Sequence, residues 1–157
     1  MEPGRFIVGN AGALVGRVLY RKHSGGKDYV IVDTGMTELL RPSHYGAFHR
    51  ISAMRDRGDA RQVDVVGPVC ESGDFLALDR ELDDVQPGDY IVVADTGAYG
   101  YVMASNYNSR LRPAEVMVDG DRFAVITARE SLADLTRLEI DAPEWHVAAA
   151  TIDGGGR

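Results

Sequence analysis

Hydrophobic and polar residues alternate in the first part of the chain with the period of two that is typical of a half-buried β-strand. In the stretch LVGRVLYRK, residues 14–22, the apolar side chains of Leu14 and Val18 alternate with arginines at positions 17 and 21. The residues HSGGKD carry a turn signal, and the β-branched run YVIVDTG, residues 29–35, follows it. The pattern therefore predicts a β-hairpin over residues 14–35.

Three further β-rich runs, VDVVGPVC, DYIVVADTG and FAVITAR, are separated by clusters of Gly, Pro, Asp and Ser. Helical patterns are fewer. RPSHYGAFHRI has a proline suited to a first helical turn, and ESLADLTRLE, residues 130–139, has leucines on one stripe. The fold class predicted is mainly β: an antiparallel β-barrel or sandwich with one or two short helices. Residues 140–157 lose all periodicity, which predicts a flexible tail.

Composition narrows the classes of partner. The 157 residues carry a net charge of −7, which argues against binding to nucleic acid or to anionic lipid. No apolar run approaches the roughly 20 residues that cross a bilayer, so we expect no membrane association. The N-terminus lacks the layout of a secretory signal and the single cysteine cannot form an internal disulfide, so we expect a cytoplasmic protein.

Taken one at a time, the polar residues do not identify a function. Cys70 alone is typical of a small buried hydrophobe, although its place in a loop between two apolar runs favours display of a reactive group. Glu71 and Arg41 alone are typical of solvated surface charges, and Tyr45 and Tyr99 of residues at the edge of a core. The spacing of His and Cys predicts no metal site, and the glycine-rich stretch GNAGALVG matches no nucleotide-binding pattern.

The combination of motifs is more specific. EPGR (residues 2–5), DTGMTELLRPSHYGAFH (33–49), VVGPVCESGDFLA (65–77) and DTGAYGYVMASNYNSRLRPAEVMVDG (95–120) occur in this order. Together they resemble the C-terminal part of the diaminopimelate decarboxylase family, whose members are fold-type III enzymes dependent on pyridoxal phosphate (PLP). The resemblance runs from Glu2 to about Leu138. It implies a C-terminal β-domain of the type found in alanine racemase and ornithine decarboxylase.

The resemblance also implies a set of cofactor-binding residues. Glu2 would face the pyridine nitrogen of PLP and keep it protonated by a charge-assisted hydrogen bond. Pro3, Gly4 and Arg5 complete this motif, and the guanidinium of Arg5 would lie beside both the cofactor phosphate and the substrate. Tyr99, between glycines in GAYG, would contact the cofactor and help to place the substrate.

The implied reaction converts meso-2,6-diaminopimelate to L-lysine and carbon dioxide, the last step of lysine biosynthesis. By resemblance, Arg41 and Tyr45 bind the distal carboxylate of the substrate, and Glu71 accepts its distal ammonium group. Cys70 would be the catalytic acid that returns a proton to the reacting carbon. In the family this loop reaches into the site of a partner subunit, which implies a homodimer.

The chain departs from the family in one respect. The N-terminal (β/α)8 barrel is absent, and neither Lys22 nor Lys27 lies in a context that matches the lysine to which the family attaches PLP. We therefore expect residues 1–13 to be a remnant of the last barrel strand and the loop after it, residues 14–139 to form the β-domain, and the isolated chain to be inactive and to bind PLP weakly or not at all. Activity would need the missing barrel half. Two alternatives stay open: a non-catalytic β-domain that serves for dimerisation or binding, and an unrelated β-barrel.

Overall fold

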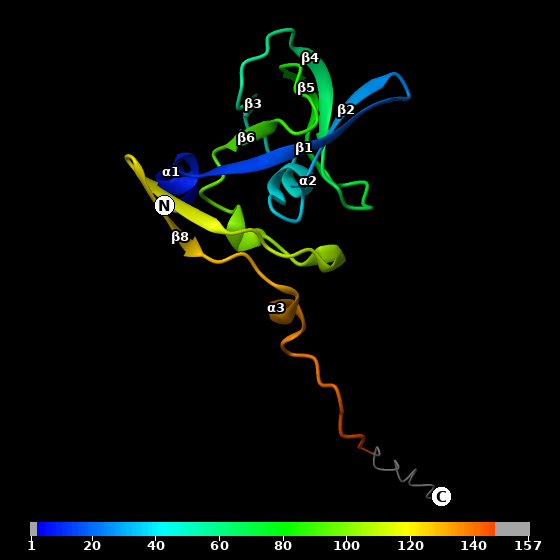
Figure 1. Ribbon diagram of the computed structural model, residues 1–157, viewed down its shortest axis with the longest axis vertical. Coiled ribbons are helices and arrows are strands. Elements are labelled where there is room, and N and C mark those ends of the chain that lie inside the picture. Colours follow the sequence, from blue (N-terminus) through cyan, green and yellow to red (C-terminus); the bar gives the residue numbers. More distant parts are fainter. Residues whose placement is uncertain (1–2, 147–157) are drawn as a thin grey trace, which may run out of the picture.

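The computed structural model describes residues 3–146, which form strands joined by short helical turns (Figure 1). The strands are β1 (Ala13–Ser24), β2 (Lys27–Val32), β3 (Ile51–Ala53), β4 (Arg61–Val66), β5 (Phe75–Leu82), β6 (Tyr90–Ala94), β7 (Glu115–Asp119) and β8 (Arg122–Thr127). The α-helices are α1 (Gly4–Val8), α2 (Arg41–Tyr45) and α3 (Leu132–Thr136), and the 3₁₀ turns are η1 (Gly9–Ala11), η2 (Tyr101–Met103) and η3 (Tyr107–Ser109).

Six of the strands form one curved sheet in the order β3-β6-β1-β2-β4-β5. Neighbouring strands are antiparallel, apart from β2 and β4, which run parallel. The two edge strands, β3 and β5, come into contact, so the sheet nearly closes on itself like a barrel. The prediction of a mainly β, mostly antiparallel fold is confirmed, and the parallel pair is a feature that the pattern did not indicate.

The long strand β1 connects the two halves of this sheet. Its first part, from Ala13 to Arg17, pairs with β6, and its second part, from Val18 to Ser24, pairs with β2. Gly25 and Gly26 both have positive φ values, 60° and 77°, which is the conformation that a tight hairpin turn requires. The hairpin predicted over residues 14–35 is therefore present.

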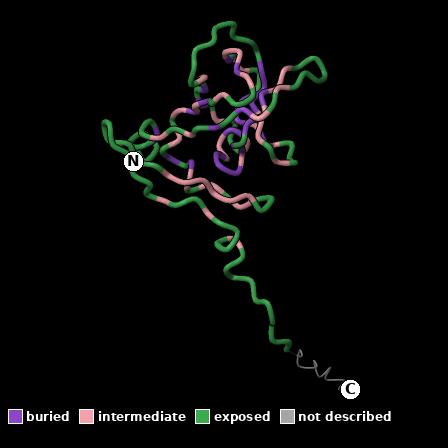
Figure 2. Tube along the Cα trace, viewed as in Figure 1, coloured by how far each residue is buried: buried purple, intermediate pink, exposed green. Residues whose placement is uncertain are grey.

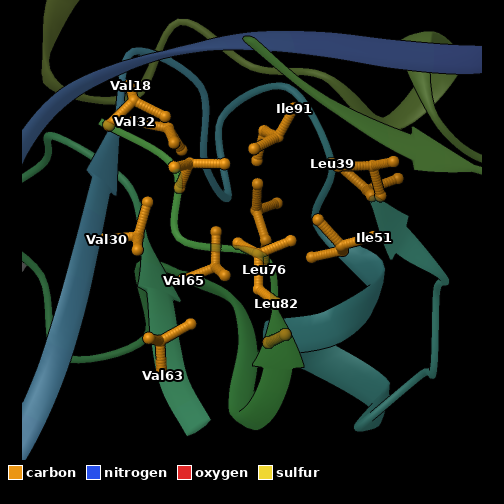
Figure 3. Packing of buried hydrophobic residues seen from close by; sticks show 13 residues of the cluster. Val18, Val30, Val32, Leu39, Ile51, Val63, Val65, Leu76, Leu82 and Ile91 are labelled. Atoms are coloured by element: carbon orange, nitrogen blue, oxygen red, sulfur yellow. The ribbon is translucent and has the colours of Figure 1, made fainter. Parts of the chain in front are cut away.

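The core lies inside the curved sheet (Figure 3). Leu76, Val65 and Ile91 come from three different strands, and each is at most 1% exposed. The core cluster consists of Val18, Val30, Val32, Leu39, Ile51, Val63, Val65, Leu76, Ala77, Leu82, Val85, Ile91 and Val93. Most of these residues are β-branched or leucine, and burying each one removes apolar surface from water. All of them come from residues 18–93.

The remaining strands, β7 and β8, form a separate two-stranded sheet beyond this core. Figure 2 shows the hairpin and the described chain after it, up to residue 146, as almost wholly exposed. The helix predicted over residues 130–139 is observed only over Leu132–Thr136, where Ser131 and Asp134 form a capping box. Its leucine stripe is not buried, because Leu132 is 69% exposed.

The other helix prediction is confirmed in part. α2 occupies the start of RPSHYGAFHRI and ends at Gly46, which adopts the left-handed conformation with φ 60°. The sequence analysis predicted no helix at Gly4–Val8, where the structure has α1. Among the described residues, no helix has the length and apolar character needed to cross a membrane.

Candidate functional site

Arg41 lies at the centre of the first group of residues that the sequence pointed to. Its guanidinium carbon is 5.8 Å from the centre of the Tyr45 ring and 5.7 Å from the centre of the Tyr99 ring, within the range of cation–π contacts. The Nε atom of Arg41 is buried and has no hydrogen-bond partner among residues 3–146. A buried donor without a partner is costly, so this guanidinium is placed to receive an anionic group.

The loop that follows β6 carries Tyr99 to this position. Tyr99 has a φ of 57°, a conformation that a bulky residue rarely adopts outside turns and functional sites. The N–H of Gly97 donates to the carbonyl of Gly9 at 3.0 Å, and a Cβ at Gly97 would collide with the carbonyl oxygen of Val8. This close approach brings α1 against the loop. A Cβ added to Gly4 would lie 3.6 Å from the hydroxyl of Tyr99.

Cys70 and Glu71 lie in the loop between β4 and β5, and both are exposed. Asp74 holds this loop in place. It is 5% exposed, and its two carboxylate oxygens accept hydrogen bonds from the N–H of Met36 at 2.8 Å and the N–H of Val69 at 2.6 Å. The loop is therefore fastened to the segment that leads into α2, although Cys70 and Glu71 themselves are exposed.

The carboxylate of Glu71 has two neighbours of its own. One oxygen accepts the N–H of Gly73 at 3.2 Å, and the other accepts the hydroxyl of Tyr107 at 3.3 Å. A Cβ added to Gly73 would lie 2.7 Å from the hydroxyl oxygen of Ser43, in α2. The Glu71 loop thus lies directly beside the helix that carries Arg41, and the site combines a cation and a carboxylate.

The charges around this loop affect Tyr107. The pKa of its phenol is raised above the ordinary value of 10.0, first by the negative charge of Glu71 and then by the hydrogen bond to the same carboxylate. Partial burial and the neighbouring Cys70 add to the increase. The raised pKa reflects the closeness of this phenol to the Glu71 carboxylate.

A second network fixes the loop that carries Tyr107. Glu38 is 7% exposed and pairs with Arg110 at 3.0 Å. Arg110 also donates to the hydroxyl of Thr37 at 3.2 Å and to the carbonyl of Asp33 at 2.6 Å. Because Glu38 lies three residues before Arg41, the network connects the Tyr107 loop to the start of α2. Its charges are mostly withdrawn from solvent, so each depends on its partner.

The structure brings together some of the residues predicted from the sequence, but not all of them. Arg41, Tyr45, Tyr99 and Gly4 come together, and Glu71 lies on the neighbouring loop. Cys70 is exposed beside Glu71. Pro3, just before α1, and Arg5, within it, are exposed as well. Glu2 falls outside the described residues. Cys70 is thus not the small buried hydrophobe that its residue type alone indicated. The sequence analysis missed Asp74, Tyr107 and Arg110, although all three lie within the quoted motifs.

Both lysines lie away from this cluster. Lys22 is in β1 opposite Tyr29, and Lys27, which begins β2, pairs with Asp64 at 3.2 Å and with Asp79 at 3.1 Å. The carboxylates raise the pKa of Lys27, mainly through the hydrogen bonds to Asp79 and Asp64, so its amine is held in the charged form. Lys27 is not a free nucleophile in this fold.

The residues present fit one side of a site for a phosphorylated ring cofactor. Gly4 leaves space beside the Tyr99 hydroxyl, and Arg5, the next residue in α1, has an exposed side chain whose guanidinium suits an anionic phosphate. A lysine for covalent attachment is not part of this cluster. Within residues 3–146, no group of three or more His, Cys, Asp or Glu side chains could hold a metal ion.

Comparison with known proteins gives the class to which this fold and site correspond. Residues 6–97 match the family described as pyridoxal-dependent decarboxylase, C-terminal sheet domain, and the chain belongs to this family. Among its relatives, diaminopimelate decarboxylase of Pseudomonas fluorescens is 51% identical over 91% of this chain and 34% of its own length. The corresponding enzyme of Aquifex aeolicus is 46% identical over 90% of this chain and 34% of its own length.

The solved structures agree with this result. The crystal structure of diaminopimelate decarboxylase from Helicobacter pylori, complexed with L-lysine, superposes with a TM-score of 0.81. It is 47% identical, and the match covers 86% of this chain and 33% of that one. The chain thus spans about a third of the length of the relatives that it matches.

Proposed function

We propose that this chain is the C-terminal β-domain of a diaminopimelate decarboxylase, the enzyme that converts meso-2,6-diaminopimelate to L-lysine and carbon dioxide. The observation that carries the proposal is the position of Arg41. Its buried Nε has no partner among the described residues, and its guanidinium lies between Tyr45 and Tyr99 beside the Glu71 loop. The high identity to diaminopimelate decarboxylases supports the same substrate class.

The substrate carries an amino-acid head at each end, and the two charged side chains suit the distal one. Arg41 and Tyr45 bind the distal carboxylate, since a guanidinium and a phenol both donate hydrogen bonds to it. Glu71 from a second copy of the enzyme accepts the distal ammonium group. L-lysine lacks the distal carboxylate, so it leaves Arg41 without a partner and binds less well. The site can therefore favour substrate over product.

Cys70 has the chemical role in this proposal. When carbon dioxide leaves, the α-carbon holds an electron pair that must take up a proton, and the Sγ–H of Cys70 supplies it. Its exposure in the loop next to Glu71 is compatible with contact to a substrate bound outside this chain's own core. The thiolate that results is reprotonated from solvent.

PLP is the cofactor of the proposed enzyme, and when bound it supplies the conjugated ring that delocalises charge from the α-carbon. Glu2, Pro3, Gly4, Arg5 and Tyr99 would hold it from this side. Arg5 would pair with an anionic oxygen, and Tyr99 would donate its hydroxyl. The lysine that attaches the cofactor comes from the part of the enzyme outside this chain, so we expect the isolated chain to be inactive.

The domain layout follows from the same proposal. Residues 1–13 would join the β-domain to a preceding barrel, and residues 14–139 would form the β-domain. Of the tail expected over residues 140–157, residues 147–157 lie outside the described residues. The exposed apolar residues of β7, β8 and α1, among them Phe6 at 89% and Phe123 at 77%, support a large surface that the rest of the enzyme covers. A second copy of the enzyme completes each site with its own Cys70 and Glu71.

We also place the enzyme in the cytoplasm. A lone cysteine cannot form an internal disulfide, and a free exposed thiol is best preserved in a reducing compartment. Biosynthesis of amino acids takes place there as well, so the substrate would be available.

Reconstitution tests the proposed function. The chain is expressed fused to the N-terminal two-thirds of the enzyme, and this joined enzyme is loaded with PLP. Carbon dioxide release from diaminopimelate is then measured. We expect turnover from the joined enzyme and none from the chain alone. Arg41→Lys and Glu71→Gln should raise KM about tenfold or more, whereas the control Arg55→Lys, in an exposed loop, should change neither constant.

Cys70→Ala separates the chemical role from the binding role. Because a proton donor acts in the chemical steps, kcat should fall while KM changes little. A joined enzyme that binds PLP but does not decarboxylate diaminopimelate would contradict the proposal and favour a non-catalytic dimerisation or binding module.

A further inference from the structure

Cys70 lies at the tip of the loop between β4 and β5. The N–H of Glu71 donates to the carbonyl of Val69 at 2.8 Å, so Cys70 is the central residue of a three-residue turn. An exposed turn of this kind is set by one hydrogen bond, and such a turn is mobile unless further contacts hold it. The direction in which the Cys70 thiol is presented therefore depends on what holds the residues on either side of it.

Asp74 contacts the residues on both sides of Cys70. Its carboxylate accepts the N–H of Val69 at 2.6 Å, and its own N–H donates to the carbonyl of Glu71 at 3.1 Å. Its carbonyl also accepts the N–H of Gly67, where the loop begins, at 2.9 Å. One residue thus holds the loop at its start and on both sides of Cys70.

The same carboxylate fixes the loop to the rest of the fold. Its second oxygen accepts the N–H of Met36, in the segment before α2, at 2.8 Å. Asp74 is 5% exposed and fits between two glycines, because a Cβ at Gly35 or at Gly67 would collide with its carboxylate oxygens. Both oxygens are thus engaged by backbone N–H groups, which suits a supporting role rather than contact with substrate.

We infer that Asp74 is a positioning residue that sets the direction in which its own chain presents the Cys70 thiol to the active site of a second copy of the enzyme. The inference rests on the proposed function, in which Cys70 supplies the proton, and adds a residue that acts through it. Proton transfer needs donor and acceptor at hydrogen-bond distance, so a small shift of the loop costs turnover. All of the contacts lie within one chain, so the loop has its shape before two copies meet.

Kinetics of the joined enzyme test this role. Asp74→Asn keeps the size of the side chain but replaces an acceptor oxygen with an N–H₂ donor that faces a backbone N–H. We expect kcat to fall about tenfold or more, and KM to rise too because Glu71 lies on the same loop. In a Cys70→Ala background the same substitution should lower kcat less than about twofold, because its effect on turnover passes through Cys70. Equal fold-changes of kcat in both backgrounds would overturn the inference.

Two controls separate this role from a general loss of stability. Asp59→Asn makes the same chemical change at an exposed position and should leave kcat unchanged. Val63→Ala shortens a buried side chain of β4 outside the loop, so it should lower the free energy of unfolding and leave kcat unchanged. If Val63→Ala lowered kcat as much as Asp74→Asn does, the loss of turnover would come from lost stability, and the inference would be wrong.

Amide hydrogen exchange in the isolated chain, followed by NMR, tests the contacts without relying on activity. In Asp74→Asn the N–H groups of Val69 and Met36 should exchange at least about tenfold faster than in wild type, and the acceleration should be larger than for Val30, in the core of the sheet. Equal acceleration at all three positions, or none, would overturn the inference while leaving the proposed function intact. A joined enzyme without decarboxylase activity would instead overturn the proposed function, and the role of Asp74 towards Cys70 with it.

Discussion

The six-stranded sheet and the β7–β8 hairpin contain similarly apolar strands but differ in what covers them. Val65, on β4, is fully buried, whereas Val118, on β7, is 71% exposed. Apolar residues stabilise a fold only when they leave water, so Val65 contributes to stability and Val118 contributes almost nothing in this chain. One region buries its apolar residues within this chain, and the other leaves them exposed.

The register of the hairpin shows that this surface has two sides. Val118 pairs with Phe123, and Met117 pairs with Ala124, so successive pairs point to opposite faces. Val118, Phe123 and Met117 are all more than half exposed. An isolated two-stranded sheet is marginally stable in water, and one that is apolar on both faces is typical of a segment enclosed by other structure.

The largest expected effect on the free energy of unfolding is that of shortening a side chain in the core of the six-stranded sheet. Leu76→Ala should reduce the free energy of unfolding of the isolated chain by about 2–5 kcal/mol, because it removes buried surface and leaves a cavity. Leu78→Ala is the control on the same strand, where Leu78 is 49% exposed, and should cost far less. Urea denaturation measures both. Similar losses at the two positions would mean that the sheet is not packed as described.

A pH effect of intermediate size should come from Glu130, which joins the chain segments before and after the β7–β8 hairpin. Glu130 accepts hydrogen bonds from the N–H of Arg112 at 2.7 Å and from Asn106 at 2.6 Å. These bonds, with the charge of Arg112, hold its pKa below the ordinary value of 4.5. Because the folded pKa is the lower one, ionised Glu130 stabilises the fold above pH 4.5, and this contribution is lost as the pH falls through the folded pKa.

Glu130→Gln should therefore be less stable than wild type at pH 6. The difference in the free energy of unfolding between the two proteins should become smaller below pH 4.5. Glu81→Gln, an exposed glutamate of β5, is the control. Urea denaturation at a series of pH values measures the effect. A stability difference that stays constant from pH 6 to pH 3 would show that Glu130 does not stabilise the fold through its charge.

The smallest effect is expected in the hairpin itself. Val118→Ala should change the free energy of unfolding of the isolated chain by no more than about 0.5 kcal/mol, because the side chain is exposed. The matched substitution Val65→Ala, of the same chemistry in the core, should cost several times more. In the joined enzyme the cost of Val118→Ala should increase. A large cost in the isolated chain would mean that the hairpin is already packed there.

The sequence predicted the parts of the fold that depend on local pattern. The period-two run of β1, the glycine turn at Gly25 and Gly26, and the helix at RPSHY were all visible, because each depends on neighbours in the chain. The parallel pairing of β2 with β4 was not, since it depends on how distant segments meet. Likewise, an amphipathic stripe in residues 130–139 indicates a buried face but not which part of the protein buries it.

In the candidate site, too, the sequence indicated some residues and not others. Arg41, Tyr45, Glu71 and Tyr99 were identified from motifs, and the structure brings three of them together with Glu71 beside them. Asp74 was passed over because an aspartate in a turn is typical of a solvated residue, and only its burial and its two backbone partners distinguish it. Such supporting residues act through contacts across 30 or more positions, which local sequence does not show.

The six-stranded sheet buries its own core, whereas the apolar residues of the β7–β8 hairpin are exposed, and we propose that the rest of a decarboxylase covers them. Hydrogen exchange by mass spectrometry tests this proposal most directly, in the isolated chain and in the enzyme joined to its N-terminal two-thirds. We predict slow exchange in β1, β4 and β5 in both samples. Residues 115–127 should exchange rapidly in the isolated chain and become strongly protected in the joined enzyme. Equal exchange of residues 115–127 in the two samples would contradict the account.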